Sequence, residues 1–304
     1  MNRAMVQLVT ASILSGVGSG LTLIAIPWDL ARRYGDSSPI ALYLAVSSLL
    51  PVLLLPRFAR SVDSSNRRRM VFLTYGGGAL IQLVLGSLST LGGGFGVLLV
   101  AGAISNLLRS FDNILVASFA QDLLEPHEFH QLTRIMELGR QGATVLCGIV
   151  AGHLLSEDSV ALILLADASS FALALSLILG VVAVAVRPPR PAHDGPNTSA
   201  LREAFEYLRG RRRMLPYLSV TSLPALLVIA ASMLYPLHFV EELQVGAQEY
   251  GALASVYGCG AMLSVLVVRV KRAGIKRSVL VRTAFGGFAL CVMVTAVMNT
   301  LWAC

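Results

Sequence analysis

The sequence is dominated by long apolar runs, and this feature limits the possible folds more than any other. A helix needs about 20 mostly apolar residues to cross ~30 Å of hydrocarbon. The runs do not alternate between apolar and polar residues, as the strands of a membrane barrel would. The sequence therefore predicts an all-α polytopic membrane protein with nine membrane-spanning helices, at residues 6–31, 39–56, 70–91, 94–121, 131–155, 158–186, 214–240, 248–268 and 278–302.

The composition excludes several classes of protein. Only 13% of the residues are charged and 55% are hydrophobic, whereas a soluble domain is about 25% charged. A soluble enzyme, a disordered scaffold and a disulfide-stapled secreted domain are therefore all excluded. We find no nucleotide-binding loop, no nucleophile motif and no complete zinc-binding spacing, so the sequence predicts neither an enzyme nor a cofactor.

The basic residues predict how the chain is oriented in the membrane. With the N-terminus in the cytoplasm, 20 of the 24 lysines and arginines fall in cytoplasmic segments, and only Arg32 and Arg33 fall in outer loops. Positive residues favour the cytoplasmic side of a membrane. We therefore expect a multi-pass protein of the inner cell membrane, in contact with lipid. Because topology accounts for the basic residues, they do not indicate a nucleic-acid partner.

The order of the spans predicts three regions. Residues 1–186 form an N-terminal bundle of six helices, and residues 214–304 hold three more spans as a partial C-terminal bundle. Residues 187–213 begin with a proline-rich cytoplasmic linker, and an amphipathic helix follows from about residue 199. Basic loops at 57–69 and 269–277 occupy the same place in each half, as in transporters built from parallel repeats.

One cytoplasmic loop carries a family motif. The segment from Ala59 to Arg69 resembles the pattern Gly-x-x-x-Asp-Arg-x-x-Arg-Arg of the major facilitator superfamily, in particular its bacterial exporter-like branch. Asp63 and the arginine run are in register, while Ala59 and Ser64 depart from the pattern. Further similarities lie at residues 20–28, 47–51 and 165–171 and at Gly251, Gly258 and Gly260.

This resemblance implies a fold and a function. The family's members are secondary transporters of twelve helices, in which two bundles rock around a central site. We therefore expect proton-coupled efflux of a small amphipathic molecule. With nine spans, the chain is a fragment, a degenerate relative, or a protein completed by a second copy or another subunit that covers the incomplete C-terminal bundle. The alternative function is a non-transporting membrane protein that acts as an assembly partner or an immunity factor.

Ionisable residues inside the spans are the candidates for substrate binding and proton coupling, because charges inside a bilayer are costly. The pairs Arg109–Asp112 and Glu137–Arg140 each share one helical face. The resemblance implies that Arg109 faces the cavity. The competing explanation is that both pairs only neutralise each other within packed helices. The complete set of candidates is Arg109, Asp112, Glu137, Arg140, Asp167 and Asp29.

Two further features predict contacts between helices. Asp63, Arg67, Arg68 and Arg69 lie in one tight loop, where a carboxylate and arginines can latch neighbouring helix ends in one conformation; the alternative is a plain positive anchor. The glycines of 16–20 and of Gly148-x-x-x-Gly152 predict close helix packing.

Overall fold

The structure is a computed structural model, and it describes residues 3–64, 67–123, 128–157, 160–182, 209–210, 214–270, 279, 282–290 and 293. Within these residues the chain is helical and contains no strand. The predicted all-α fold is therefore confirmed. The linker and its amphipathic helix, predicted at 187–213, lie outside the described residues except for Arg209 and Gly210.

The helices coincide with the first eight predicted spans to within a few residues, except that α2 continues beyond its span. The ninth predicted span, 278–302, is described only in part and is helical over 282–290. The principal helices are α1 (Arg3–Tyr34), α2 (Ser37–Ser64), α3 (Arg67–Val71), η1 (Phe72–Gly76), α4 (Gly77–Thr90), α5 (Phe95–Leu123), α6 (Phe129–Ser156), α7 (Val160–Val182), α9 (Met214–Glu241) and α10 (Ala247–Val270).

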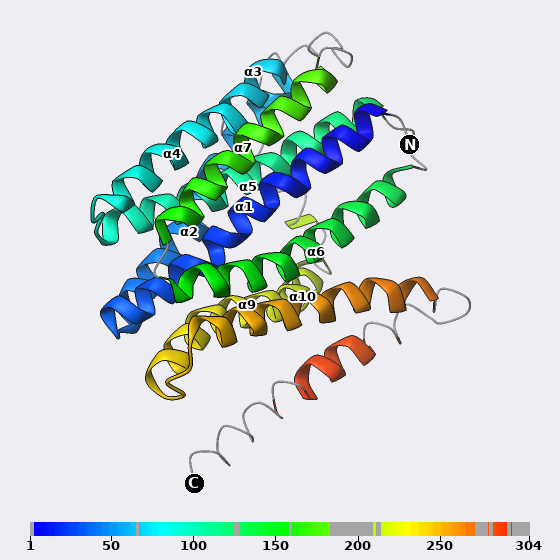
Figure 1. Cartoon of the computed structure of the whole chain (residues 1–304). Helices are drawn as coiled ribbons and strands as arrows, with labels where there is room; N and C mark the ends of the chain where they lie inside the picture. Colours follow the sequence, from blue (N-terminus) through cyan, green and yellow to red (C-terminus); the bar gives the residue numbers. More distant parts are fainter. Residues whose placement is uncertain are drawn as a thin grey trace.

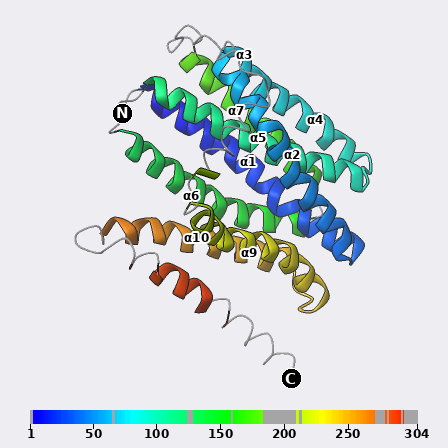
Figure 2. The ribbon, with the colours of Figure 1, turned by 180° about the vertical axis from the view of Figure 1, so that it is seen from behind.

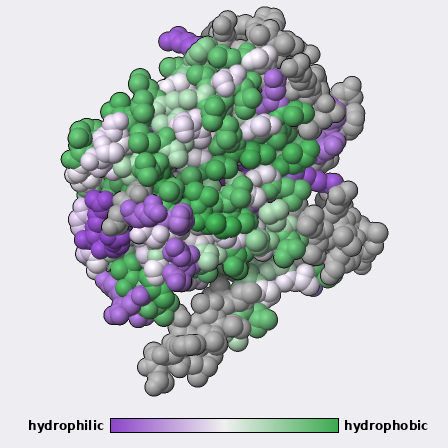
Figure 3. All heavy atoms as spheres, in the orientation of Figure 1, coloured by the Kyte–Doolittle hydropathy of each residue, from purple (hydrophilic) through white to green (hydrophobic). Residues whose placement is uncertain are grey.

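Five helical stretches of the described chain are long and apolar enough to cross a membrane. They are Val6–Tyr34, Ser37–Val62, Arg69–Thr90, Phe95–Gln121 and Val160–Gly180. The helix α6 has a similar length, but its first half carries Arg134, Glu137 and Arg140. On the face seen in Figure 3, hydrophobic side chains cover the middle of the bundle and hydrophilic ones gather mainly near the helix ends. This distribution suits a molecule surrounded by lipid.

The third predicted span contains a local irregularity. A π-helical turn, η1, joins α3 to α4; it ends at Gly76, and Gly77 and Gly78 follow it directly. A π turn inserts one residue into a helix and often occurs at a functional site. Here it holds Tyr75, whose buried side chain points into the bundle.

The helices form one bundle with α1 near its centre. The helix α1 packs against α5, α6 and α7, while α2 lies along α5 and α4 along α7. In Figures 1 and 2, α6 has the other helices of the first half on one side and α9 and α10 on the other, with α10 running beside α6. We call the end where α1 begins, at Arg3, the near end, and the end where α1 finishes, at Tyr34, the far end.

The buried core has two parts. A near-end cluster draws residues from every helical element between α1 and α7, and includes Leu8, Tyr75 and Phe171. A far-end cluster includes Trp28 and Tyr250. Among the described residues, those of α9 and α10 pack in this cluster and not in the near-end one. The helices α9 and α10 are thus anchored to the bundle at its far end.

Candidate functional site

A cavity of about 430 Å³ occupies the near half of the bundle, between α1, α5 and α6. It extends from Gly20, in the middle of α1, toward Phe129 at the start of α6. Most of its walls are apolar or small, and four charged side chains project among them. These are Arg109 and Asp112 from α5 and Glu137 and Arg140 from α6.

Asp112 is the most buried of these four charged groups, with 5% of its surface exposed. Its Oδ2 accepts a hydrogen bond of 2.5 Å from Ser12 Oγ of α1. Its Oδ1 accepts a short hydrogen bond from the hydroxyl of Tyr75 in the π turn. A single carboxylate at the cavity wall therefore connects α1, the third span and α5.

Arg109 lies one helical turn from Asp112 and lines the same cavity. Among the described residues it has no hydrogen bond and no ion pair within 4 Å. Three other charged groups line the same cavity: Arg140 has the same charge, while Asp112 and Glu137 have the opposite charge. The predicted Arg109–Asp112 pair is therefore not a direct ion pair, because the carboxylate oxygens of Asp112 face the hydroxyls of Ser12 and Tyr75.

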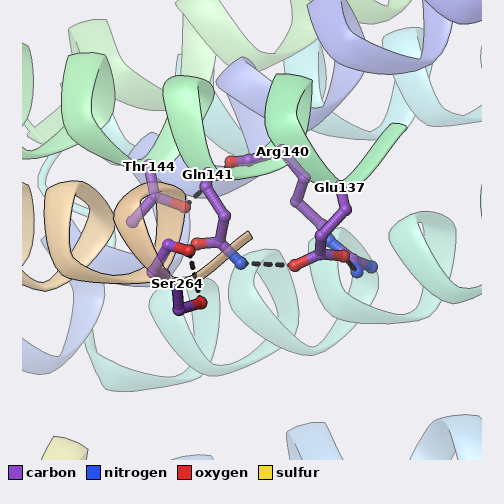
Figure 4. Close-up of polar contacts among 6 residues, drawn as sticks. Glu137, Arg140, Gln141, Thr144 and Ser264 are labelled. Atoms are coloured by element: carbon purple, nitrogen blue, oxygen red, sulfur yellow. Dashed lines mark hydrogen bonds and ion pairs between the residues drawn. The ribbon is translucent and has the colours of Figure 1, made fainter. Parts of the chain in front are cut away.

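Glu137 and Arg140 do form the predicted pair. Their side chains project from one side of α6, as Figure 4 shows, and join in a short ion pair. Gln141 Nε2 adds a hydrogen bond of 2.6 Å to Glu137 Oε1. The side chain of Arg140 is 46% exposed and that of Glu137 is 31% exposed, so the pair is only partly buried.

Asp167 belongs to a different site. It is fully buried on α7, outside the set of residues that line the cavity. Its oxygens accept hydrogen bonds from Ser105 Oγ at 2.7 Å, Gln82 Nε2 at 2.9 Å and Thr22 Oγ1 at 3.0 Å, and a longer one from Ser19. This network connects α1, α4, α5 and α7.

The remaining candidates lie at the two ends of the bundle. Asp29 is near the far end of α1, where Arg33 Nε lies 2.7 Å from its Oδ2, and it does not line the cavity. Asp63 lies in the last turn of α2, and α3 begins at Arg67 after an undescribed gap of two residues. Arg69 is exposed, and the side chains of Arg67, Arg68 and Asp63 are not described. The latch therefore stays a prediction.

Several polar partners were missed by the sequence analysis. Ser12 and Tyr75 hold Asp112, while Gln82, Ser105 and Thr22 hold Asp167. The signal was present, since a glutamine inside an apolar span must find a hydrogen-bond partner. Which acid each polar residue would meet depends on how the helices pack.

Small residues bring α6 and α10 into backbone contact toward the far end. A Cβ atom added to Gly251 would lie 2.7 Å from the Cα atom of Gly152, and Ser255 Oγ donates a hydrogen bond of 2.9 Å to Val145 O. The predicted close packing at Gly148 and Gly152 is therefore confirmed. At this end Trp28 of α1 also stacks on Tyr250 of α10, with 5.1 Å between ring centroids. The helices are thus packed closely at the far end, while the cavity occupies the near half.

A family model described as Major Facilitator Superfamily matches residues 8–304 of the chain. No curated protein matches the sequence.

Proposed function

Since the chain belongs to the major facilitator superfamily and is thereby a membrane transporter, we propose that it exports a small amphipathic molecule in exchange for protons. The central cavity with its four charged residues carries this proposal. A volume of about 430 Å³ suits a drug-sized molecule, because ligand pockets of this kind measure ~300–1,000 Å³. Apolar walls would hold the body of such a substrate, and the few charged groups would orient it.

Asp112 is the proposed proton-coupling residue. It is the carboxylate of the cavity that lies deepest, and Ser12 and Tyr75 fix its orientation. A carboxylate at a cavity wall changes its affinity for protons as water reaches it or leaves it. Substrate and proton would compete there, because a protonated Asp112 no longer offers a negative charge beside Arg109. Through this competition, binding of a proton would release the substrate, and binding of the substrate would release the proton.

Arg109, Glu137 and Arg140 are proposed to orient the substrate. Arg109 lies without a direct partner among the described residues, so its donors are available to a polar group of the bound molecule. The Glu137–Arg140 pair borders the same cavity from α6. Asp29 and Asp167 do not line the cavity, so we assign them no direct contact with the substrate.

Alternating access would proceed by separation at the far end. In the described conformation α6 and α10 touch there through glycines. We infer from the basic residues that the near end faces the cytoplasm, which makes this conformation the one that loads a substrate for export. The loop with Asp63 and Arg67–Arg69 would then latch helix ends in the opposite conformation.

The test is a transport assay with purified protein in liposomes that contain a pH-sensitive dye. A pH gradient is imposed, and a panel of cationic, neutral and anionic amphipathic dyes is added. We expect at least one dye to cause a saturable, protein-dependent proton movement. Asp112→Asn should abolish the exchange while the protein still elutes as a single folded species.

Asp36→Asn is the matched control, because Asp36 is exposed in the turn between α1 and α2 and its Oδ1 accepts hydrogen bonds from Ser37 and Ser38. This variant should transport as well as the unmodified chain. Dye movement that is not linked to protons, or exchange that persists in Asp112→Asn, would contradict the proposed coupling.

A further inference from the structure

The charged groups of the cavity balance one another. Arg109 and Arg140 supply two positive charges, and Asp112 and Glu137 supply two negative ones. The other residues that line the cavity carry no charge. A charge without a counter-charge is costly in a site that is shielded from water. A substrate with one net charge would therefore upset this balance, whereas an uncharged substrate preserves it.

Both acids of the cavity already have donors at each of their oxygens. The two oxygens of Asp112 accept hydrogen bonds from hydroxyl groups of α1 and of the π turn. Oε1 of Glu137 accepts a hydrogen bond from Gln141, and its Oε2 takes part in the ion pair with Arg140. A carboxylate oxygen has a second lone pair, but Arg140 balances the charge of Glu137, and Asp112 is only 5% exposed. An ammonium group of a substrate would thus find no carboxylate free to balance it.

Arg109 is the opposite case. It lines the cavity, and among the described residues it has neither a hydrogen-bond partner nor an ion-pair partner. A guanidinium group donates through five N–H bonds in a planar fork and accepts no hydrogen bond. Donors without an acceptor are costly in a largely apolar cavity. The polar group that fits beside Arg109 is therefore a hydrogen-bond acceptor.

From these observations we propose that the substrate is an uncharged amphipathic molecule whose polar end is a carbonyl group, as in a ketone, an ester or a lactone, and that Arg109 binds this carbonyl. Such a group accepts hydrogen bonds from the guanidinium and adds no charge to the cavity. The inference rests on the proposed function, because it takes the cavity as the substrate site and proton exchange as the reaction.

The direction of proton movement separates this substrate class from an anionic one. An anion beside Arg109 would bind best when Asp112 holds a proton, because Arg109 then lacks a negative neighbour. Substrate and proton would bind together and move in the same direction. An uncharged carbonyl instead binds while the charges of Arg109 and Asp112 balance. A proton on Asp112 would leave Arg109 uncompensated, and water drawn to this charge would displace the carbonyl, as an exchange requires.

The apolar part of the substrate has a place beside Gly16 of α1. This residue lines the cavity, and a Cβ atom added to it would meet no heavy atom within 4 Å. About one turn to either side, α1 and α6 approach each other closely, through Ile13 at Gly139 and through Gly20 at Cys147. The space beside Gly16 is thus a notch between two helix contacts, and it would hold an apolar ring edge or a methyl group.

The experiment measures equilibrium binding of four compounds that share a naphthalene body and differ only in the group at one ring carbon. They are acetylnaphthalene, naphthylethylamine, naphthoate and ethylnaphthalene, which end in a neutral carbonyl, an ammonium, a carboxylate and a hydrocarbon. Tritiated compounds are added to the full chain in nanodiscs without a pH gradient, and binding to empty nanodiscs is subtracted. A parallel set with a biphenyl body represents larger substrates. We expect the ketones to bind saturably and about tenfold or more tightly than the other three compounds of each set.

Matched variants assign the preference to Arg109. Arg109→Met should weaken binding of the ketones by about tenfold or more and leave the hydrocarbons unchanged, so that the preference disappears. Arg57→Met is the control, because Arg57 is exposed on α2 and lies outside the set of residues that line the cavity; it should bind all compounds as the unmodified chain does. Gly16→Val fills the notch and should weaken the biphenyl ketone more than the naphthalene one. The comparison of compounds on the unmodified chain needs no variant, so it decides the matter even if Arg109→Met fails to fold.

Three results would overturn the inference. They are tightest binding by the amine or the carboxylate, no saturable binding of either ketone, and a preference for ketones that survives Arg109→Met. Because binding is measured without a pH gradient, the ketones can bind even if no dye exchanges with protons, and then only the proposed coupling fails. Proton exchange driven by a charged dye, together with absent ketone binding, would uphold the proposed function and refute this substrate class.

Discussion

A single methyl group at the crossing of α6 and α10 should open the far end of the molecule. The change is Gly251→Ala on α10. The added Cβ atom would lie 2.7 Å from Cα and 2.9 Å from N of Gly152 on α6. Both are backbone atoms and cannot rotate away, so the two helices must move apart.

The size of the effect follows from these distances. Carbon atoms in contact normally lie about 3.5–4.0 Å apart, so α6 and α10 would separate by about 1 Å. Overpacking of this kind costs about 1–3 kcal/mol. If the far end is tightly closed in only one conformation, the strain shifts the equilibrium toward the other by about 5–150-fold.

Trp28 of α1 provides the assay, because it is 4% exposed and stacks on Tyr250, which directly precedes Gly251 on α10. Quenching of its fluorescence by iodide is measured in a Trp302→Phe background, so that a single tryptophan reports. Gly251→Ala should increase the quenching constant severalfold. Gly152→Ala, whose Cβ contacts would be 3.0–3.3 Å, should give a smaller increase.

Gly260→Ala is the control on the same helix, because a Cβ atom there meets nothing within 4 Å. It should leave the quenching unchanged. If Gly251→Ala quenches no more than Gly260→Ala, then α6 and α10 do not hold the far end closed, and the reasoning from backbone contact fails.

Two further changes test the buried polar sites by thermal unfolding in detergent. Gly18→Ala places a Cβ atom 2.7 Å from Oδ1 of Asp167 and should destabilise the protein by about 1–3 kcal/mol. Gly16→Ala is the control and should be neutral, because its Cβ atom meets nothing within 4 Å. Equal effects of the two changes would contradict tight packing around Gly18. Tyr75→Phe removes one of the two hydroxyl donors of Asp112 and should cost about 1–3 kcal/mol. An unchanged unfolding temperature would show that this bond does not stabilise the bundle.

Much of the fold was predictable because a membrane allows few solutions. Long apolar runs must be helices, and the observed helices coincide with the predicted spans to within a few residues, apart from the longer α2 and the ninth span, which is described only in part. The ion pair of Glu137 and Arg140 was predictable as well, since residues three apart on a helix are neighbours. Such local features depend only on the sequence within one helix.

The long-range partners were not predictable in the same way. Asp112 and Arg109 share a helical face, yet Asp112 bonds to Ser12, 100 residues earlier in the chain, and to Tyr75. The π turn that holds Tyr75 changes the direction of every side chain after it, and an apolar run does not reveal such a turn. Asp167 and Asp29 were candidates by charge alone, and packing places both outside the cavity lining.

The polar face of α1 has a consequence for how the protein is made. Ser12, Ser15, Ser19 and Thr22 follow one stripe of this helix and are all buried. Thr22 bonds to Asp167, 145 residues later in the chain. At a synthesis rate of about 5–20 residues per second, α1 waits roughly 7–30 s before that partner exists. During this time its hydroxyl groups would be in lipid without their final partners, so the insertion machinery is expected to retain α1 until the later helices arrive.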